Sequence, residues 1–367
     1  MINERKALIL SVGYGRGHHS AARALAEEMQ RRSWQTRVID PCALAHPHIF
    51  RFTQGFYNFC VRHSPALWGV VYRRLDTADW SRMIHRPIIR ACIDAIRREV
   101  AQMAPDLVVC TYPLFAYMLD HLTARGELSI PYAVVVTDAL AISSPWVLSQ
   151  APLICLPDAL SAEQVAQQHS LPPERLAAPG FPVRAEFAPG SRPTPGPDGR
   201  DLHVVYGAHA RTARVKADIS AMLKEWPQMR LSIVADPKRH AALAGLLRLA
   251  PGVSICPPGQ DMAELLRTAH LYVGKAGAAT VFEAYSAEVP VLVNYSLPGQ
   301  EQGNLQLLLH DAAGLQAEST EALLQGLHRL LDNSAAGWLA TCAAMRTARR
   351  AGGAARTIET LERRFFA

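Results

Sequence analysis

A glycine-rich loop that ends in a histidine follows the first predicted strand. The strand is expected over residues 7–11, and the loop after it reads Gly13-Tyr-Gly-Arg-Gly-His18 and leads into a helix. Glycines such as Gly15 and Gly17 let the backbone approach a ligand closely, and a helix N-terminus favours negative charge. The third glycine comes one residue too early for a G-x-G-x-x-G dinucleotide motif. Asp40, expected at the end of the second strand, would still suit a ribose hydroxyl, so an NAD-dependent dehydrogenase remains open as an interpretation.

A second loop in the C-terminal half has the residue types for phosphate and ribose binding. It reads Gly274-Lys-Ala-Gly-Ala-Ala-Thr280-Val-Phe-Glu283. Backbone N–H groups and the hydroxyl of Thr280 could hold a diphosphate, and Glu283, one helical turn further on, could accept hydrogen bonds from a ribose diol. A capping box from Thr280 to Glu283 would explain the same pair without any ligand.

A third loop has side chains that suit the hydroxyl groups of a sugar. It reads Leu297-Pro-Gly-Gln-Glu-Gln-Gly-Asn304 and presents Gln300, Glu301 and Asn304. Both C-terminal loops are expected where a strand ends and a helix begins, which is where doubly wound sheets bind ligands. A capping box does not account for this third loop.

The elements that position these loops alternate between strands and helices in both halves of the chain. From Ala188 to Gly199 the chain has four prolines and three glycines, which is typical of a linker. Repeated strand–helix units imply parallel sheets with right-handed crossovers. We therefore predict an α/β fold with two doubly wound, Rossmann-like domains that face a cleft. The predicted ranges are 1–188 for the N-terminal domain with a helical, basic and aromatic insertion at 45–103, 189–200 for the linker, 201–334 for the C-terminal domain, and 335–367 for C-terminal helices that could pack back on the N-terminal domain.

The composition excludes several classes of protein. Of the 367 residues, 49% are hydrophobic and 19% are charged, which supplies apolar material for two cores and argues against low-complexity disorder. No stretch reaches the roughly 18 uninterrupted apolar residues that a membrane-spanning helix needs. The N-terminus lacks the pattern of a cleavable signal, and the seven cysteines form no C-x-x-C pair. We therefore predict a reduced, cytoplasmic protein without a zinc site.

The positive charge is concentrated in one segment. The formal net charge is +6, and residues 51–98 contain nine arginines against three aspartates, so the rest of the chain sums to zero. Aromatic residues are interleaved with these arginines, among them Trp68 and Tyr72. Such a segment would suit an interface with an anionic membrane, or a solvated helical subdomain that buries its aromatic residues. Nucleic acid is not favoured as a partner, because no nucleic-acid-binding motif accompanies the arginines.

Taken together, the motifs resemble glycosyltransferase family 28. The resemblance is carried by G-x-G-H in the first loop, Val136-Thr-Asp138, Gly180-Phe-Pro-Val-Arg184 and the two C-terminal loops, in family order over roughly residues 7–330. Within the family, they are most similar to the branch of monogalactosyldiacylglycerol synthases and processive diacylglycerol glucosyltransferases. The resemblance implies a GT-B architecture and an inverting transfer of a hexose from a UDP-sugar to a lipid acceptor of the diacylglycerol type. A lipid acceptor would favour membrane contact through the Arg-rich segment 51–98 and a peripheral location on the inner face of the membrane.

The resemblance also implies roles for individual residues. His18 matches the family's motif histidine and would be the general base, with Asp138 as its partner or substitute. Thr280 and Glu283 would contact the phosphate and the ribose, and Gln300 and Glu301 would contact the sugar. The other candidates are Gly207, Arg211, Gly277, Ala278 and Asn304 on the donor side and Gly15, Gly17, Trp68, Tyr72 and Trp146 on the acceptor side. No D-x-D motif occurs in the chain, so we predict no essential bound metal and no cofactor besides the UDP-sugar substrate.

Two loops depart from the family pattern. The turn after the linker reads Gly207-Ala-His-Ala-Arg211 instead of a run of glycines, although Arg211 could add a charge-assisted contact to phosphate. The segment between Asp138 and Trp146 lacks the histidine that the family commonly has there. These departures leave two alternatives open: an enzyme like the UDP-sugar 2-epimerases, and a non-catalytic descendant that binds a nucleotide or a lipid.

Overall fold

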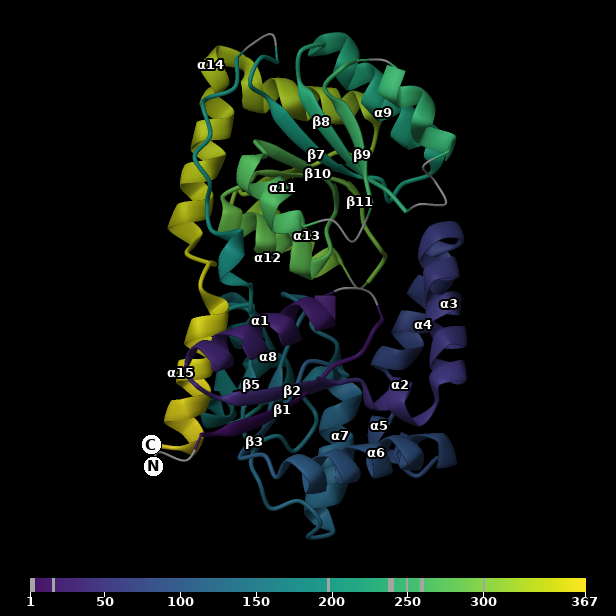
Figure 1. Cartoon of the computed structure of the whole chain (residues 1–367), viewed down its shortest axis with the longest axis vertical. Coiled ribbons are helices and arrows are strands. Elements are labelled where there is room, and N and C mark those ends of the chain that lie inside the picture. The colour runs from purple at the N-terminus through teal and green to yellow at the C-terminus, as the bar shows by residue number, and fades with distance from the viewer. Residues whose placement is uncertain are drawn as a thin grey trace. The chain divides into compact units, whose positions relative to one another are not determined.

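The computed structural model describes residues 4–14, 17–196, 199–236, 241–248, 250–257, 261–299 and 301–367, which form two compact units (Figure 1). The first unit comprises the chain up to Ala185 together with Pro298–Gly303 and Ala351–Ala367. The second comprises Glu186–Leu297 and Asn304–Arg350. Each unit is built on a six-stranded parallel sheet flanked by helices, which confirms the predicted pair of doubly wound α/β folds.

The sheet of the first unit has the strand order β2-β1-β3-β4-β5-β6, and every neighbouring pair is parallel. Along β1, Ala7 and Ile9 pack with α1 and α15 on one face, whereas Leu8 and Leu10 pack on the opposite face, as the two-residue period of a strand requires. The strand order reverses direction between β1 and β3, which is where such sheets bind ligands. The strands are Lys6–Leu10 (β1), Gln35–Ile39 (β2), Leu107–Cys110 (β3), Tyr132–Val135 (β4), Ile154–Cys155 (β5) and Leu176–Ala177 (β6).

Four of the five helices between β2 and β3 begin at proline. Proline occupies the first position of α2, α3, α4 and α6, where its fixed φ suits a helix and its missing N–H is not needed. No described helix is both long enough and apolar enough to span a bilayer. The helices of this unit are Gly17–Arg31 (α1), Pro41–Ala45 (α2), Pro47–His63 (α3), Pro65–Asp76 (α4), Trp80–Met83 (α5), Pro87–Met103 (α6), Pro113–Ala124 (α7), Ala159–His169 (α8) and Gly353–Phe365 (α15).

The sheet of the second unit has the order β12-β11-β10-β7-β8-β9, again with parallel neighbours throughout. Its order reverses direction between β7 and β10. The strands are His203–Gly207 (β7), Arg230–Val234 (β8), Val253–Cys256 (β9), Leu271–Lys275 (β10), Val291–Tyr295 (β11) and Gly314–Gln316 (β12). The helices are Thr212–Glu225 (α9), Met262–Thr268 (α11), Ala278–Ala287 (α12), Gln302–His310 (α13) and Thr320–Ala348 (α14).

A few elements differ from the sequence prediction. The strands β5, β6 and β12 were not predicted, because two or three residues are too few to show a period of two. The helix expected over 238–249 includes, in its described part, a 3-10 helix at Ala244–Arg248. Helix α14 runs across the expected boundary at residue 334 and leaves helical geometry at Asp332–Ala335.

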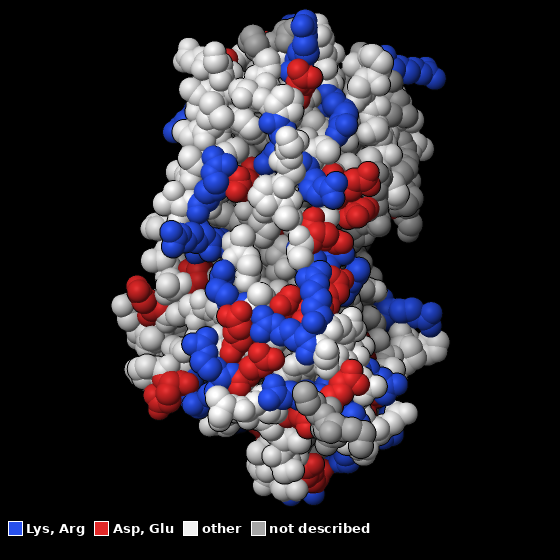
Figure 2. Space-filling model, turned by 60° about the vertical axis from the view of Figure 1, so that its left-hand side comes forward, with Lys and Arg blue, Asp and Glu red and all other residues white. Residues whose placement is uncertain are grey.

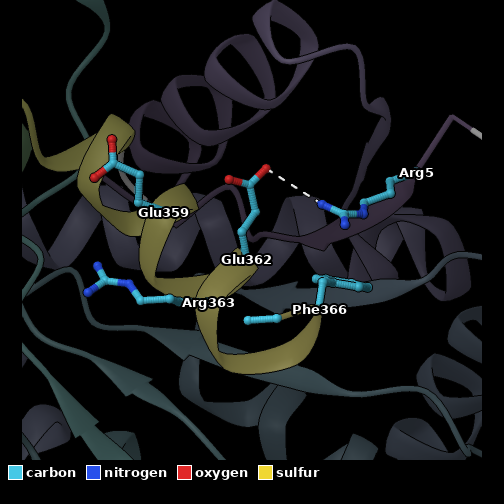
Figure 3. Close-up of a pocket in the computed structure, with 6 residues that line it drawn as sticks. Arg5, Glu359, Glu362, Arg363 and Phe366 are labelled. Carbon is cyan, nitrogen blue, oxygen red and sulfur yellow. Dashed lines mark ion pairs between the residues drawn. The ribbon is translucent and has the colours of Figure 1, made fainter. Parts of the chain in front are cut away.

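The C-terminal helix α15 is held on α1 within the first unit. Arg32, just after α1, forms ion pairs with Glu359 and Glu362 of α15. The guanidinium of Arg5 lies 4.6 Å from the centroid of the Phe366 ring. Figure 3 shows Arg5 and Glu362 pointing toward one another across a shallow hollow of about 490 Å³. On the face drawn in Figure 2, acidic and basic side chains are interspersed, so this face carries no large patch of one sign.

Candidate active site

The imidazole of His18 is buried at the start of α1, in the first unit. Its Nδ1 lies 2.8 Å from Oγ1 of Thr137, which follows β4. The ring centroid lies 5.2 Å from that of Tyr112, which follows β3, and 5.9 Å from that of Trp146. The carboxyl ends of β1, β3 and β4 therefore bring these side chains together at the point where the strand order reverses.

Burial governs the charge of His18. Removal from water lowers the pKa of this imidazole to about 4, against the opposing effect of a backbone hydrogen bond with Thr111. His18 is consequently neutral at pH 7, which is the form that can accept a proton. If Thr137 accepts the proton of Nδ1, the lone pair of Nε2 is available for that role.

The lowered pKa of His18 predicts an acid-sensitive fold. The unfolded chain binds a proton at His18 near pH 6.5, whereas the folded chain binds it only near pH 4, so the stabilisation is complete above pH 6.5 and is lost as the pH falls toward 4. We expect His18 to contribute up to about 3 kcal/mol to this loss. Burial also lowers the pKa of His203 to about 4, so the comparison must be made against His18→Gln. Urea unfolding of both proteins between pH 7 and pH 4.5 checks the prediction, and the same pH dependence in both would contradict it.

Asp138 and Trp146 are joined in a loop that is fixed at several points. Nε1 of Trp146 donates to Oδ2 of Asp138 at 3.0 Å, and the backbone N–H of Ser144 donates to Oδ1 of Asp76 at 2.8 Å. Leu140 has a φ of +53° and donates its N–H to a serine hydroxyl. The hydroxyl of Thr137 lies at Nδ1 of His18, and Asp138, which the sequence suggests as a partner of His18, is the next residue along the chain. Asp138 thus lies beside Trp146 in the same buried loop.

Asp40 has a structural role that excludes the ribose contact of an NAD enzyme. Its carboxylate accepts hydrogen bonds from the backbone N–H groups of Gly13, Cys42 and Ala43, so it fixes the glycine loop and caps α2. Gly17 is the first residue of α1, and a Cβ there would meet open space. The expected acceptor-side residue Gly15 lies outside the described residues.

Trp68 and Tyr72 both lie on α4. The ring of Trp68 packs edge-on against Tyr57 of α3, with centroids 4.7 Å apart. Tyr72 packs against Gly299, and burial, with a contribution from the charge of Asp138, raises the pKa of its hydroxyl. Tyr72 therefore lies near the Asp138 loop, whereas Trp68 supports α3.

The loop after β10 in the second unit opens α12. Gly277 is the N-cap and Ala278 is the first helical residue, so Thr280 lies within the first turn and Glu283 is buried one turn later. A capping box between Thr280 and Glu283 is therefore wrong, because the helix begins before Thr280. No side chain caps the first turn and no acidic residue lies in it, so its N–H groups and positive dipole end suit an anion.

The turn after β7 adjoins that loop across the point where the strand order reverses. Gly207 and Gly274 both lie against Tyr272, and a Cβ on either glycine would clash with the tyrosine hydroxyl. These two glycines therefore make room for a buried tyrosine. Arg211 is the N-cap of α9 and is exposed, which leaves its guanidinium able to reach a solvent-accessible anion.

The third predicted loop is divided between the units. The segment Pro298–Gly303 groups with the first unit, whereas the sequence predicted it in the C-terminal domain. Within the first unit it packs closely, because a Cβ on Gly303 would overlap the carbonyl oxygen of Ala139. Glu301 is buried in this segment. Asn304 is buried in the second unit and its Nδ2 donates to the carbonyl of Ala276 at 3.1 Å, so it fixes the loop that leads into α12. Gln300 lies outside the described residues.

Sequence reasoning missed two neighbours of His18. Thr137 and Tyr112 each follow a buried strand by two residues, but only the strand order shows that β3 and β4 end near β1. Thr137 lies in the Val-Thr-Asp sequence, so its position at the end of a strand was the available signal.

Comparisons with known proteins identify sequence relatives of this chain. Residues 18–183 match the sequence model of the monogalactosyldiacylglycerol (MGDG) synthase family, and residues 246–358 match that of the glycosyltransferase family 28 C-terminal domain. A processive diacylglycerol beta-glucosyltransferase from Bacillus cytotoxicus is 24% identical over 356 residues, which cover 90% of this chain and 88% of the relative. The chloroplastic monogalactosyldiacylglycerol synthase of Spinacia oleracea is 26% identical over 343 residues, which cover 87% of this chain and 65% of the relative.

The fold is also found among solved structures. MurG from Acinetobacter baumannii superposes with a TM-score of 0.61 and 18% identity, over 98% of this chain and 99% of that one. At this identity the likeness concerns the fold, and it extends over both units. The two matched family models and these relatives show that this chain is a glycosyltransferase of family 28, in the branch of the monogalactosyldiacylglycerol synthases and processive diacylglycerol glucosyltransferases.

Proposed function

We propose that this glycosyltransferase moves a hexose from a UDP-sugar to a lipid acceptor of the diacylglycerol type, with inversion at the anomeric carbon. The observation that carries the proposal is the buried, neutral imidazole of His18, at the start of the region that matches monogalactosyldiacylglycerol synthases. The names of the relatives support diacylglycerol as the acceptor class.

In the proposed reaction, His18 acts on the acceptor. Its free ring nitrogen takes the proton of the acceptor hydroxyl as the oxygen attacks the anomeric carbon. The bond from that carbon to the diphosphate oxygen breaks on the opposite face, and the electron pair leaves with the nucleotide. Thr137 holds the ring in position through its contact with Nδ1, and Asp138, which accepts a hydrogen bond from Trp146, fixes the adjacent loop.

On the donor side, we propose that the leaving diphosphate is held by hydrogen bonds and by positive charge. The first-turn N–H groups of α12, the hydroxyl of Thr280 and the guanidinium of Arg211 would stabilise the negative charge that develops on it. We assign the ribose to Glu283 and the sugar hydroxyls to Gln300 and Glu301. The chain has no D-x-D motif, and we propose catalysis without an essential bound metal.

The test is a direct search for product. The purified protein is incubated with a panel of UDP-sugars and a membrane lipid extract, and the lipids are analysed by mass spectrometry. The proposal expects a lipid heavier by one hexose, together with stoichiometric UDP. Release of UDP or an isomerised sugar without a new lipid would instead indicate chemistry like that of the 2-epimerases. Nucleotide binding without any turnover would indicate a non-catalytic protein.

We also propose that α3 docks on an anionic membrane through an outer stripe of apolar residues. Ile49, Phe52, Phe56 and Phe59 recur at helical spacing and are 45%, 75%, 45% and 54% exposed. Helix α3 contains no acidic residue, and the arginines 51, 73 and 74 on α3 and α4 are exposed. An exposed aromatic stripe beside cationic side chains matches the chemistry of an anionic lipid surface.

The outer stripe predicts salt-sensitive binding to vesicles. We expect Phe52→Ser combined with Phe56→Ser to weaken binding to anionic vesicles at least about tenfold, since burial of each ring contributes on the order of 1 kcal/mol or more. The matched control is Leu339→Ser, which removes an exposed apolar side chain on α14. Co-sedimentation with neutral and anionic vesicles at two salt concentrations gives the measurement. Absence of binding at both salt concentrations would remove the membrane claim.

A further inference from the structure

Helix α3 presents an inner face to the glycine loop, and this face differs from the outer stripe. Phe50, Thr53, Gln54 and Tyr57 recur at positions i, i+3, i+4 and i+7, which places them on one side of the helix. These four side chains are buried or half-buried, in contrast to the exposed outer stripe. The inner face is thus packed, and what it packs on is the segment that leads to His18.

The polar groups of Gly13 are held by two side chains. Nε2 of Gln54 donates to the carbonyl oxygen of Gly13 at 2.6 Å, and the N–H of Gly13 donates to the carboxylate of Asp40 at 3.0 Å. A Cβ on Gly13 would come within 3.0 Å of the Phe50 ring and 3.2 Å of Gln54, so the backbone lies tightly against α3. One peptide group on each side of Gly13 is therefore fixed by a side chain.

Tyr14 lies between α3 and the rings that surround His18. Its hydroxyl lies 2.7 Å from Oγ1 of Thr53, and its ring centroid lies 5.3 Å from that of Phe50. On its other side, the Tyr14 ring lies 6.2 Å from that of Tyr112, which in turn lies 5.2 Å from His18. Only four residues separate Gly13 from His18 along the chain. Both the backbone and a chain of packed rings therefore connect α3 to the imidazole.

We infer that Gln54, with Thr53, is a positioning residue for the glycosyl transfer: it sets the backbone of Gly13 and Tyr14 and through them the place of His18. The inference rests on the proposed role of His18 as the base. Gln54 contacts the backbone of Gly13 and acts on His18 through the loop. A loop displaced by even about 1 Å can lower the rate of a positioned reaction about a hundredfold, so one hydrogen bond can matter to turnover more than to stability.

The test removes the hydrogen-bond donor without changing the size of the side chain. Gln54→Met keeps the length and loses the N–H, and Gln54→Glu puts a carboxylate against the Gly13 carbonyl. Gln54→Lys restores a donor. The matched control is Asn58→Met, which makes the same kind of change at an exposed position one turn further along α3. Each variant is assayed with a short-chain, water-soluble diacylglycerol acceptor, so that vesicle binding does not enter the measurement.

We expect Gln54→Met and Gln54→Glu to lower kcat about tenfold or more, with the KM for the UDP-sugar and the affinity for UDP within twofold of the parent. Gln54→Lys should recover most of the lost kcat, and Asn58→Met should stay within twofold. A kcat unchanged in Gln54→Met, or one that falls only in proportion to a lower folded fraction by circular dichroism, overturns the inference. The outcome for His18→Ala separates the two proposals: if that variant is inactive and Gln54→Met is fully active, the base assignment stands and the positioning role fails.

Discussion

His18→Ala is expected to lower kcat about 10²–10⁴-fold and to leave the affinity for UDP unchanged, because general-base catalysis contributes that much and the imidazole lies in a different unit from the proposed donor site. The loss should appear equally in kcat and kcat/KM, as for a group that acts only in the transition state. In the unmutated protein, the imidazole of His18 should also remain neutral in mild acid. With a pKa of about 4 for His18, the acidic limb of its kcat/KM profile should lie nearer pH 4 than pH 6.5.

Two neighbouring variants make the interpretation of His18→Ala specific. His19 is half-buried and its Nδ1 lies 3.0 Å from the hydroxyl of Ser11, so His19→Ala removes an imidazole next in sequence without removing the proposed base. It should retain activity within a few-fold. Thr137→Val removes the partner of Nδ1 and should reduce kcat less than His18→Ala does. If His18→Ala turned over within a few-fold of the parent with UDP binding intact, the assignment of the base would be wrong.

The sequence predicted the two sheets because their strands are separated by helices and the linker is dense in proline and glycine. It also placed the candidate ligand-binding loops at strand ends, where the structure has them. It could not predict that the hydroxyl of Thr137 lies at Nδ1 of His18, because the order of the strands, which brings β4 close to β1, is not visible in the sequence. Nor could it separate a capping Asp40 from a ribose-binding one. That distinction depends on which N–H groups point at the carboxylate.

Helix α3 shows why burial was harder to predict than secondary structure. Its aromatic residues satisfy a helical period on two faces at once, with Phe50 and Tyr57 on one and Phe52, Phe56 and Phe59 on the other. Periodicity therefore predicts the helix and leaves open which face is packed. The contacts of Gly13 and Tyr14 decide it. Helix α3 thus has one face packed on the glycine loop and an opposite face of exposed aromatic residues.

Glu283→Gln is expected to weaken binding of UDP about 10–100-fold, because hydrogen bonds to a charged carboxylate contribute roughly 1.5–3 kcal/mol. Glu283 is buried on α12, one turn after Thr280, and we assign its carboxylate to the ribose diol. The donor ribose does not change during transfer, so this contact should act equally on the ground state and the transition state. The KM for the UDP-sugar should therefore rise, whereas kcat at saturating donor should change little.

The ribose assignment can be tested apart from general damage to α12. Calorimetric titrations with UDP and with its 2′-deoxy analogue should show that the parent prefers UDP and that Glu283→Gln has lost most of that preference, since the variant lacks the charged acceptor for the missing hydroxyl. Glu288→Gln is the matched control, because Glu288 caps the far end of the same helix and pairs with Arg346. That control should leave UDP affinity and the preference unchanged. If the Glu283→Gln variant still discriminates between the two nucleotides as the parent does, the ribose binds elsewhere. Helix α12 would then contact only the diphosphate.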